Sequence, residues 1–232
     1  MKTFSEKINA YNRALDFQEK LPGNIRVMNP FKENKNVIEV SEAFYQKYYN
    51  DLNPRFLILG INPGRFGAGL TGIPFTDSVR LKERCGITNY TGPETHELSS
   101  VFIYDMIEQY GGEEKFYNKF FINSLSPLGF TTIKETGKEV NCNYYDSKEL
   151  TEAVRPFIIN NMQELINLGF EHSTCVCLGT GKNQQFLNKL NKEYGFFGNI
   201  ITLEHPRFIM QYRLKKKQEY IEKYIEILNS IS

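Results

Sequence analysis

Four short apolar runs in the chain each end in a polar or glycine-rich turn, and longer segments with helical periodicity separate them. The runs cover residues 56–59, 120–122, 175–178 and 200–203. Strands that alternate with helices are typical of a parallel sheet that carries helices on both faces. The pattern therefore predicts an α/β fold: a three-layer α/β/α sandwich with a central, mainly parallel four-stranded sheet.

The polar residues at the ends of these runs are the first candidates for a functional site. Asn62 follows the first run, Asn123 closes the second, a Gly-Thr-Gly turn at residues 179–181 follows the third, and His205 follows the fourth. In open α/β sheets, ligands bind in the crevice outside the carboxyl ends of the strands. We therefore expect the four turns to converge on one crevice.

Helical patterns fill the segments around these runs. The expected capping residues are Thr3 with Glu6, Thr76 or Asp77, and Ser99 or Ser100. Further helices are expected over residues 40–49, 146–168 with an interruption at Pro156, 183–194, and about 211–228. Because no internal repeat, low-complexity segment or linker is visible, we expect a single domain over residues 1–232.

Length and composition are those of a globular protein without a membrane anchor. The 232 residues are 41% hydrophobic and 24% charged, and a chain of this length buries roughly 70% of its unfolded surface. No stretch approaches the length of a membrane-spanning helix. The first residues lack the apolar core of a signal peptide. The expectation is a cytoplasmic protein with no membrane partner.

The four cysteines are Cys85, Cys142, Cys175 and Cys177. Their spacing matches no zinc-binding motif, and a four-thiolate iron–sulfur site would need all four to be gathered in space. A disulfide framework is typical of much shorter, secreted chains. We interpret these residues as reduced structural thiols and expect neither a metal nor a cofactor.

Basic residues are concentrated after His205, although the net charge is close to zero. The formal charge is +1, so no global field draws the chain to nucleic acid. From His205 to the C-terminus there are six basic and three acidic residues. Such a run is most often a solvated helix face. Its position directly beyond His205 raises the alternative that it binds phosphates.

The loop after the first apolar run has an unusual composition. Residues 62–75 contain four glycines, two prolines and two phenylalanines, a length and mixture that an ordinary connection does not need. Phe75 is a candidate for stacking on a planar ring, with a core position as the alternative. The loop lacks the spacing of a dinucleotide site, and neither it nor the turn at 179–181 has the ending of a P-loop. We therefore favour a shaped pocket over a phosphate loop, and a plain strand-to-helix connection at 179–181.

Three motifs of the chain resemble, in their order and spacing, those of one enzyme family. Residues 60–75 contain Asn-Pro-Gly-x-Phe-Gly and Thr-Gly-x-Pro-Phe, residues 123–128 begin with Asn and end with Pro-Leu, and residues 205–206 are His-Pro. These segments are similar to motifs of the SMUG-type (single-strand-selective monofunctional) uracil-DNA glycosylases. The first is highly specific, and the other two are weak alone. The pattern most resembles a divergent bacterial, SMUG2-like branch.

The resemblance implies an enzyme that extrudes a damaged base from DNA and binds it in a fitted pocket. Gly64, Phe66, Phe75 and Asn123 would bind the base. Phe75 would stack on the ring, and the Asn123 amide would pair with O4 and N3–H of uracil. Cytosine presents the reversed donor–acceptor pattern, so a clamped amide would reject it. The small Gly64 would leave room for a substituent at C5.

The catalytic roles that the resemblance implies belong to Asn62 and His205. Asn62 would position the attacking water against the anomeric carbon of the sugar. His205, as a neutral donor, would stabilise the negative charge that develops near O2 of the leaving base, by about 3 kcal/mol in analogy with oxyanion-hole donors. No lysine nucleophile is implied. We therefore expect a monofunctional glycosylase that initiates base excision repair.

Two segments depart from the family pattern. Beyond the His-Pro motif, the residues predicted to contact DNA are Arg207, Phe208, Ile209, Arg213 and Lys215. Either Phe208 or Ile209 is expected to be the wedge that fills the vacated base stack. Residues 131–146 have no clear counterpart in the family.

Other functions stay open at this point. The same pocket would suit a hypoxanthine- or xanthine-DNA glycosylase, or a non-catalytic module that binds DNA lesions or free bases. A nucleotide-binding protein of unrelated purpose is disfavoured by the absent P-loop ending. The presence of both Asn62 and His205 favours an enzyme. Its expected partner is single- or double-stranded DNA, and it is expected to be a monomer.

Overall fold

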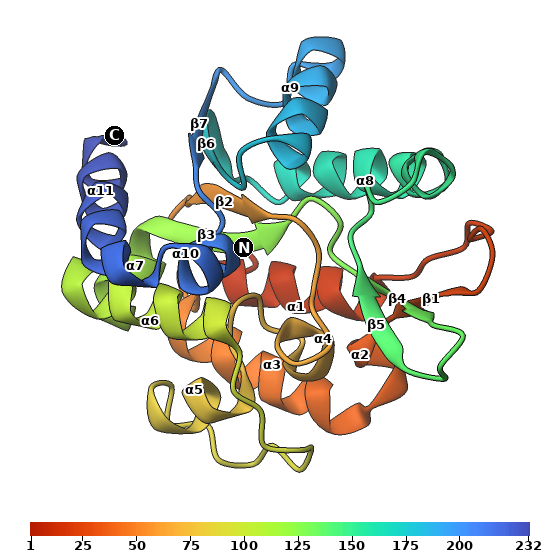
Figure 1. Cartoon of the computed structure of the whole chain (residues 1–232). Coiled ribbons are helices and arrows are strands. Elements are labelled where there is room, and N and C mark those ends of the chain that lie inside the picture. Colours follow the sequence, from red (N-terminus) through yellow and green to blue (C-terminus); the bar gives the residue numbers. More distant parts are fainter.

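The computed structural model describes all residues, 1–232, and its strands form two separate sheets (Figure 1). The strands are β1 (Ile25–Met28), β2 (Phe56–Gly60), β3 (Phe120–Ser124), β4 (Gly129–Ile133), β5 (Glu139–Cys142), β6 (Glu171–Leu178) and β7 (Asn199–Leu203). One sheet has the order β3-β2-β6-β7, and all its neighbouring strands are parallel. This confirms the predicted parallel four-stranded sheet, and each apolar run lies within one of its strands.

Eleven α-helices and one 3-10 helix surround the strands. They are α1 (Phe4–Ala14), α2 (Pro30–Glu33), α3 (Lys35–Tyr48), α4 (Ala68–Thr71), α5 (Ser78–Glu83), α6 (Leu98–Tyr110), α7 (Glu113–Lys119), α8 (Lys148–Asn167), α9 (Lys182–Tyr194), α10 (Pro206–Tyr212), η1 (Leu214–Lys216) and α11 (Lys217–Ser230). Helices α6, α10 and α11 lie on one side of the parallel sheet, to the left in Figure 1, and α8 and α9 lie on the other. The predicted three-layer α/β/α arrangement is confirmed.

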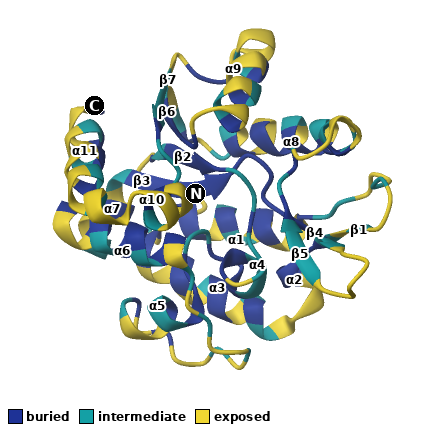
Figure 2. Ribbon diagram, viewed as in Figure 1, coloured by how far each residue is buried: buried dark blue, intermediate teal, exposed yellow.

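Two consecutive phenylalanines of β3 show how this sheet packs on both faces. The ring of Phe120 lies 5.4 Å from that of Phe116 in α7 and 5.9 Å from that of Tyr110 in α6. The ring of Phe121 lies 5.6 Å from that of Tyr49, at the end of α3. Because successive side chains of a strand point to opposite faces, adjacent aromatic residues fasten helices to both sides. Figure 2 shows β3 in the colour of buried residues, and it is buried along its whole length.

The second sheet was not predicted. It is antiparallel, in the order β1-β4-β5, and it lies beside the parallel sheet in Figure 1. β1 and β5 have four residues each, most of them only partly buried. Short, half-polar strands carry no apolar run that would mark them in the sequence. The stretch 131–146, which had no family counterpart, contains most of the β4–β5 hairpin.

Three predicted helix boundaries agree with the structure. Thr3 and Glu6 form the complete capping box of α1. Asp77 caps α5 by accepting the Arg80 N–H over 2.9 Å. α9 begins one residue before the predicted start and ends where predicted. The helix expected over residues 40–49 begins earlier, at Lys35.

Three helix predictions are wrong. α6 has Glu97 at its N-cap, and both predicted serines lie inside the helix, where Ser100 donates its hydroxyl to the Glu97 carboxylate. α8 runs unbroken through Pro156, which lies on the exposed face where carbonyls without an N–H partner can be hydrated. The segment expected to form one helix over residues 211–228 is divided at Arg213, whose φ of −133° ends α10.

The cysteines agree with their interpretation as structural thiols. All four are buried and unpaired. Burial raises the pKa of Cys177 to about 12, so this thiol is not ionised near neutral pH.

No helix is both long enough and apolar enough to cross a bilayer.

Candidate active site

The carboxyl ends of the parallel strands lie level with one another. Gly60 at the end of β2 pairs with Ser124 at the end of β3, and Leu178 at the end of β6 pairs with Leu203 at the end of β7. The turns that follow these strands therefore open on one edge of the sheet, as the sequence predicted. Ligands of parallel sheets bind at this edge.

Asn62 is held by three hydrogen bonds to the backbone. Its Nδ2 donates to the Cys142 carbonyl over 3.1 Å and to the Pro63 carbonyl over 3.3 Å. Its Oδ1 accepts the N–H of Tyr144 over 3.1 Å. An amide has two hydrogens and two oxygen lone pairs, so one lone pair of Oδ1 is left. The side chain can therefore accept a hydrogen bond from a water molecule but has no hydrogen left to donate.

Two of these contacts come from residues 131–146, which have no clear counterpart in the family. Cys142 is the last residue of β5, and Tyr144 lies in the segment between β5 and α8. It is tied to the parallel sheet in turn, because the Tyr144 hydroxyl donates to Asn183 Oδ1 over 2.8 Å. Asn183 is buried near the start of α9 and donates to the Leu178 carbonyl over 3.0 Å. These bonds join Asn62 to the end of β6 through residues far apart in sequence. No local signal reveals them.

Phe75 is the one residue other than glycine whose backbone φ is positive, at 52°. Left-handed backbone is costly for an aromatic residue, and such strain persists where the surrounding structure imposes it. The ring lies on Gly60, where a Cβ would come within 3.1 Å of two ring atoms. Its centroid lies 5.7 Å from that of the His205 ring. The structure thus brings Phe75 to His205 at the strand ends.

His205 is fixed as a neutral donor. Its Nδ1 accepts the Arg207 N–H over 3.1 Å and so caps α10. Since Nδ1 accepts, the proton of the neutral ring is on Nε2. Burial, with a smaller contribution from the positive charge of Arg207, lowers the pKa of His205 to about 4. The imidazole therefore offers a neutral Nε2–H near neutral pH.

Asn123 is buried at the end of β3, and its Oδ1 accepts the N–H of Ser124 over 2.8 Å. A small cavity of about 10 Å³ adjoins it and is lined in part by Asn12, Tyr45 and Pro63. That volume holds about one water molecule and not a base. This cavity therefore has no room for a base in this conformation.

Phe66 and Gly64 occupy different places in the first loop. The Phe66 side chain is 48% exposed, and the guanidinium of Arg65 lies over its ring at 4.2 Å. Phe66 therefore points to solvent rather than into a pocket. Gly64 faces a crowded polar environment, since a Cβ there would lie 3.0 Å from Glu97 Oε1 and 3.5 Å from Asn141 Nδ2.

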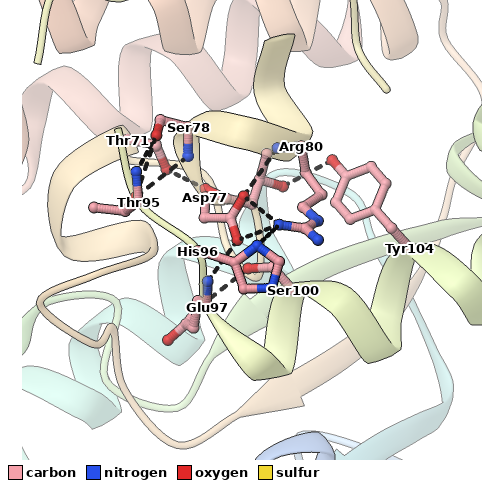
Figure 3. Close-up of polar contacts among 10 residues, drawn as sticks. Thr71, Asp77, Ser78, Arg80, Thr95, His96, Glu97, Ser100 and Tyr104 are labelled. Atoms are coloured by element: carbon pink, nitrogen blue, oxygen red, sulfur yellow. Dashed lines mark hydrogen bonds and ion pairs between the residues drawn. The ribbon is translucent and has the colours of Figure 1, made fainter. Parts of the chain in front are cut away.

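Glu97 is a site residue that the sequence did not reveal. Its N–H donates to Asp77 over 2.7 Å, and Ser100 donates to its carboxylate over 3.1 Å, within the polar cluster of Figure 3. Burial is the main cause that raises the pKa of Glu97 to about 7, and the nearby charge of Asp77 raises it further. The side chain lies against the first loop so closely that a Cβ on Gly67 would be 2.1 Å from Oε2.

The basic residues after His205 divide into two groups. Three have acidic partners: Lys216, Lys217 and Lys223 pair with Glu219, Asp105 and Glu204. The other three, Arg207, Arg213 and Lys215, are exposed and form no ion pair. These are the three basic residues that the sequence singled out for DNA.

The two candidates for the wedge differ in exposure. Phe208 is 40% exposed, and the Arg213 guanidinium lies 5.5 Å from its ring centroid. Ile209 is fully buried and packs into the core. The prediction that Ile209 contacts DNA therefore has no support in this conformation, because of the two candidates only Phe208 faces outward.

Comparison with known proteins identifies this α/β/α protein as a base-excising enzyme. The model of the uracil DNA glycosylase superfamily matches residues 46–229. The chain belongs to this superfamily: it is a DNA glycosylase, and its substrate is DNA. It is 55% identical to wild-type SMUG2 of Pedobacter heparinus, whose crystal structure it matches with a TM-score of 0.96 over 99% of this chain and 98% of that chain. The SMUG2-like resemblance is thereby confirmed. None of the curated proteins compared with the chain matches it.

Proposed function

We propose that this glycosylase hydrolyses the N-glycosidic bond of uracil in DNA and leaves the strand intact. The observation that carries the proposal is the hydrogen bonding of Asn62, which leaves a single acceptor lone pair on Oδ1. That lone pair can hold a water molecule by one of its hydrogens and direct its oxygen toward the anomeric carbon of an extruded nucleotide. An amide is a poor base, so orientation is its contribution.

His205 acts on the leaving group in this proposal. As the bond between C1′ and N1 breaks, its electron pair stays with the base, and negative charge develops at O2. The neutral Nε2–H of His205 donates to that oxygen. Water then adds to the oxocarbenium-like sugar and releases a proton to solvent, and the departed base takes up a proton. Phe75, held against His205, stacks on the base.

The exposed residues of α10 and its surroundings form the proposed DNA contact. Arg207, Arg213 and Lys215 have no acidic partner to compete with phosphates. Phe208 is the proposed wedge, because its ring is exposed and the side chain of Ile209 is buried. Phe66, which faces solvent beside Arg65, is reassigned from the base pocket to this surface.

The environment of Gly64 supports an extension of the substrate to 5-substituted uracils. Glu97 Oε1 and Asn141 Nδ2 both lie where a side chain of residue 64 would be, and neither atom has a hydrogen-bond partner in the protein. A hydroxyl group carried on C5 could donate to the carboxylate and accept from the amide. This niche is polar, so it favours hydroxylated substituents over methyl groups.

The test is base release from labelled oligonucleotides, single- and double-stranded, that carry uracil, 5-hydroxymethyluracil, hypoxanthine or xanthine. Alkali-dependent strand breaks at uracil are expected for the wild type, because a monofunctional enzyme leaves an abasic site. Glu97→Ala should reduce release of 5-hydroxymethyluracil more than release of uracil. Release of purines alone would replace uracil with hypoxanthine or xanthine as the substrate. Binding to damaged DNA with no release of any base would point to a lesion-binding module.

A further inference from the structure

The turn that carries Phe75 has a backbone form that usually takes glycine. The N–H of Thr76 donates to the Ile73 carbonyl over 3.1 Å, so Pro74 and Phe75 are the two central residues of the turn. The φ of Phe75 is 52°. A positive φ at the second central position is characteristic of a type II turn, where glycine or asparagine is the usual residue and proline commonly precedes it. A phenylalanine keeps this conformation only where surrounding contacts impose it.

Thr76 is the residue through which such contacts reach Phe75. Its hydroxyl donates to the Pro74 carbonyl over 3.2 Å and lies 2.9 Å from the hydroxyl of Tyr104 in α6. Its carbonyl accepts the hydroxyl of Thr71 over 2.6 Å. Thr71, Thr76 and Tyr104 are all buried, so the protein itself supplies their partners. Bonds to Pro74 and to Thr76 therefore fix the chain on both sides of Phe75.

The hydroxyl of Tyr104 has only one way to bond Thr76. A carbonyl can only accept, so the Thr76 hydroxyl gives its one hydrogen to Pro74 and must accept from Tyr104. Tyr104 accepts in turn from the Tyr117 hydroxyl over 3.3 Å, and the Cys85 thiol lies 3.1 Å from it. Since the hydrogen of Tyr104 goes to Thr76, the thiol also donates to it. The hydrogen and both lone pairs of the Tyr104 oxygen are then used, and a fully satisfied buried network of this kind is rigid.

The position of the Phe75 ring depends on the conformation that this network holds. A Cβ on Gly60 would lie 3.1 Å from two atoms of the ring, and the ring centroid is 5.7 Å from that of His205. The backbone angles of a residue set the direction of its Cα–Cβ bond. Relaxation of Phe75 to a negative φ would therefore carry the ring away from Gly60 and His205.

We propose that Thr76 and Tyr104 are positioning residues that hold Phe75 in this conformation and so keep its ring in place to stack on an extruded base. The proposal rests on the proposed function, in which Phe75 binds the base. Thr76 follows the first motif directly, and Tyr104 lies in α6, outside all three motifs. α6 thus acts on base binding through hydroxyl groups behind the turn and not through contact with the base.

The first test compares Thr76→Val with Thr76→Ser. Valine keeps the shape of the side chain but removes the hydroxyl, and serine restores the hydroxyl. Because stacking of a base on an aromatic ring contributes about tenfold or more, Thr76→Val should lower the single-turnover rate of uracil release by about tenfold. Thr76→Ser should retain most of the rate. In a Phe75→Ala background, Thr76→Val should have no further effect, because the ring that it positions is gone.

A second variant, Tyr104→Phe, removes the donor to Thr76 and covers the case in which Thr76→Val does not fold. Its matched control is Tyr49→Phe. Tyr49 is as deeply buried as Tyr104, but its hydroxyl donates to the Phe120 carbonyl, at the start of β3 and away from the turn. Tyr104→Phe should lower the rate of uracil release, and Tyr49→Phe should leave it unchanged.

An NMR measurement on the free protein reports the ring position without any activity. An NOE between the Phe75 ring and the Hα protons of Gly60 should be present in the wild type, Thr76→Ser and Tyr49→Phe. It should weaken in Thr76→Val and Tyr104→Phe. If it weakens there while Phe75→Ala releases uracil at the wild-type rate, the positioning holds and the role of Phe75 in the proposed function fails. An NOE of wild-type strength in both Thr76→Val and Tyr104→Phe overturns the inference.

Discussion

At the residue scale, backbone groups fix the orientation of the polar side chains at the strand ends. Each side chain is thereby left with defined donor and acceptor atoms. Both amide hydrogens of Asn62 go to carbonyls, and the N–H of Arg207 fixes the tautomer of His205. Ser124 likewise binds the oxygen of Asn123. Groups held in this way do not have to reorganise when charge develops in the transition state. In the proposed mechanism, these side chains are therefore oriented for hydrolysis before DNA binds.

The neutral His205 predicts a flat pH dependence near neutrality. Because its pKa is lowered to about 4, the ionisation of His205 should not change the single-turnover rate between about pH 6 and pH 8 and should lower it only as the pH approaches 4. The free energy of unfolding should change in the same direction. Because folding lowers the pKa of His205 from its ordinary value of 6.5, neutral His205 stabilises the fold above pH 6.5, and this stabilisation is lost as the pH falls through 4. A rate that rises as pH falls below about 6.5 would instead identify the imidazolium as the active form.

Replacement of Asn123 by aspartate tests its role in base reading. A carboxylate cannot donate to O4 of uracil, but it can accept from the amino group of cytosine. Asn123→Asp should therefore lower uracil release by about tenfold or more and raise the ratio of cytosine to uracil release. Asn160→Asp, at an exposed position of α8, is the control. An unchanged base preference would remove Asn123 from this role.

At the element scale, the small antiparallel sheet and the segment that follows it hold the first loop in place. β4 begins at Gly129, where a Cβ would lie 2.4 Å from the Pro63 carbonyl oxygen. β5 ends at Cys142, and Cys142 and Tyr144 are the backbone partners of Asn62. β4 thus packs against Pro63, and the residues at and after the end of β5 hydrogen-bond Asn62, so both hold neighbouring residues of the first loop.

Gly129→Ala is expected to separate β4 from this loop. The clash is with backbone, which cannot rotate away, so the free energy of unfolding should fall by about 1–3 kcal/mol, and uracil excision should fall as Asn62 moves. Chemical denaturation and single-turnover rates measure the two effects. Ile133→Ala, at the exposed end of the same strand, should change the stability by less than about 0.5 kcal/mol. A fully active and stable Gly129→Ala protein would contradict this coupling.

The same elements show what the sequence could and could not predict. The four parallel strands were evident because strands buried on both faces need continuous apolar runs, and the turns beyond them carry Asn62, Asn123 and His205. The hairpin partners of Asn62 were missed, because β5 is short and half-polar. The break after α10 was missed too, since nothing local to Arg213 marks it. Glu97 was missed because only the fold brings it to Gly64.

At the whole-molecule scale, α1 lies outside the residues matched by the superfamily model but is part of the same packed structure. Tyr11 bonds Asn161 of α8, and the ring of Phe17, just beyond α1, lies 5.1 Å from that of Phe157 in the same helix. These contacts support the proposal that residues 1–232 are one domain.

The division of the basic residues predicts which of them contribute to DNA binding. Arg213→Ala and Lys215→Ala should weaken binding to undamaged DNA and reduce the slope of log Kd against log salt by about 1 each. Lys217→Ala is the control, because Lys217 is already paired with Asp105. The excision rate at saturating enzyme should stay the same in all three variants. A loss of affinity in Lys217→Ala as large as in the other two would refute this assignment of the surface.

The central claim is that the one free lone pair of Asn62 holds the nucleophilic water. The most direct measurement is the single-turnover rate of uracil release by wild type and Asn62→Ala, with the melting temperature of each recorded. We expect the rate to fall by about 100-fold or more, while binding of uracil-containing DNA is retained and the fold is intact. An Asn62→Ala enzyme that releases uracil at the wild-type rate would contradict the claim.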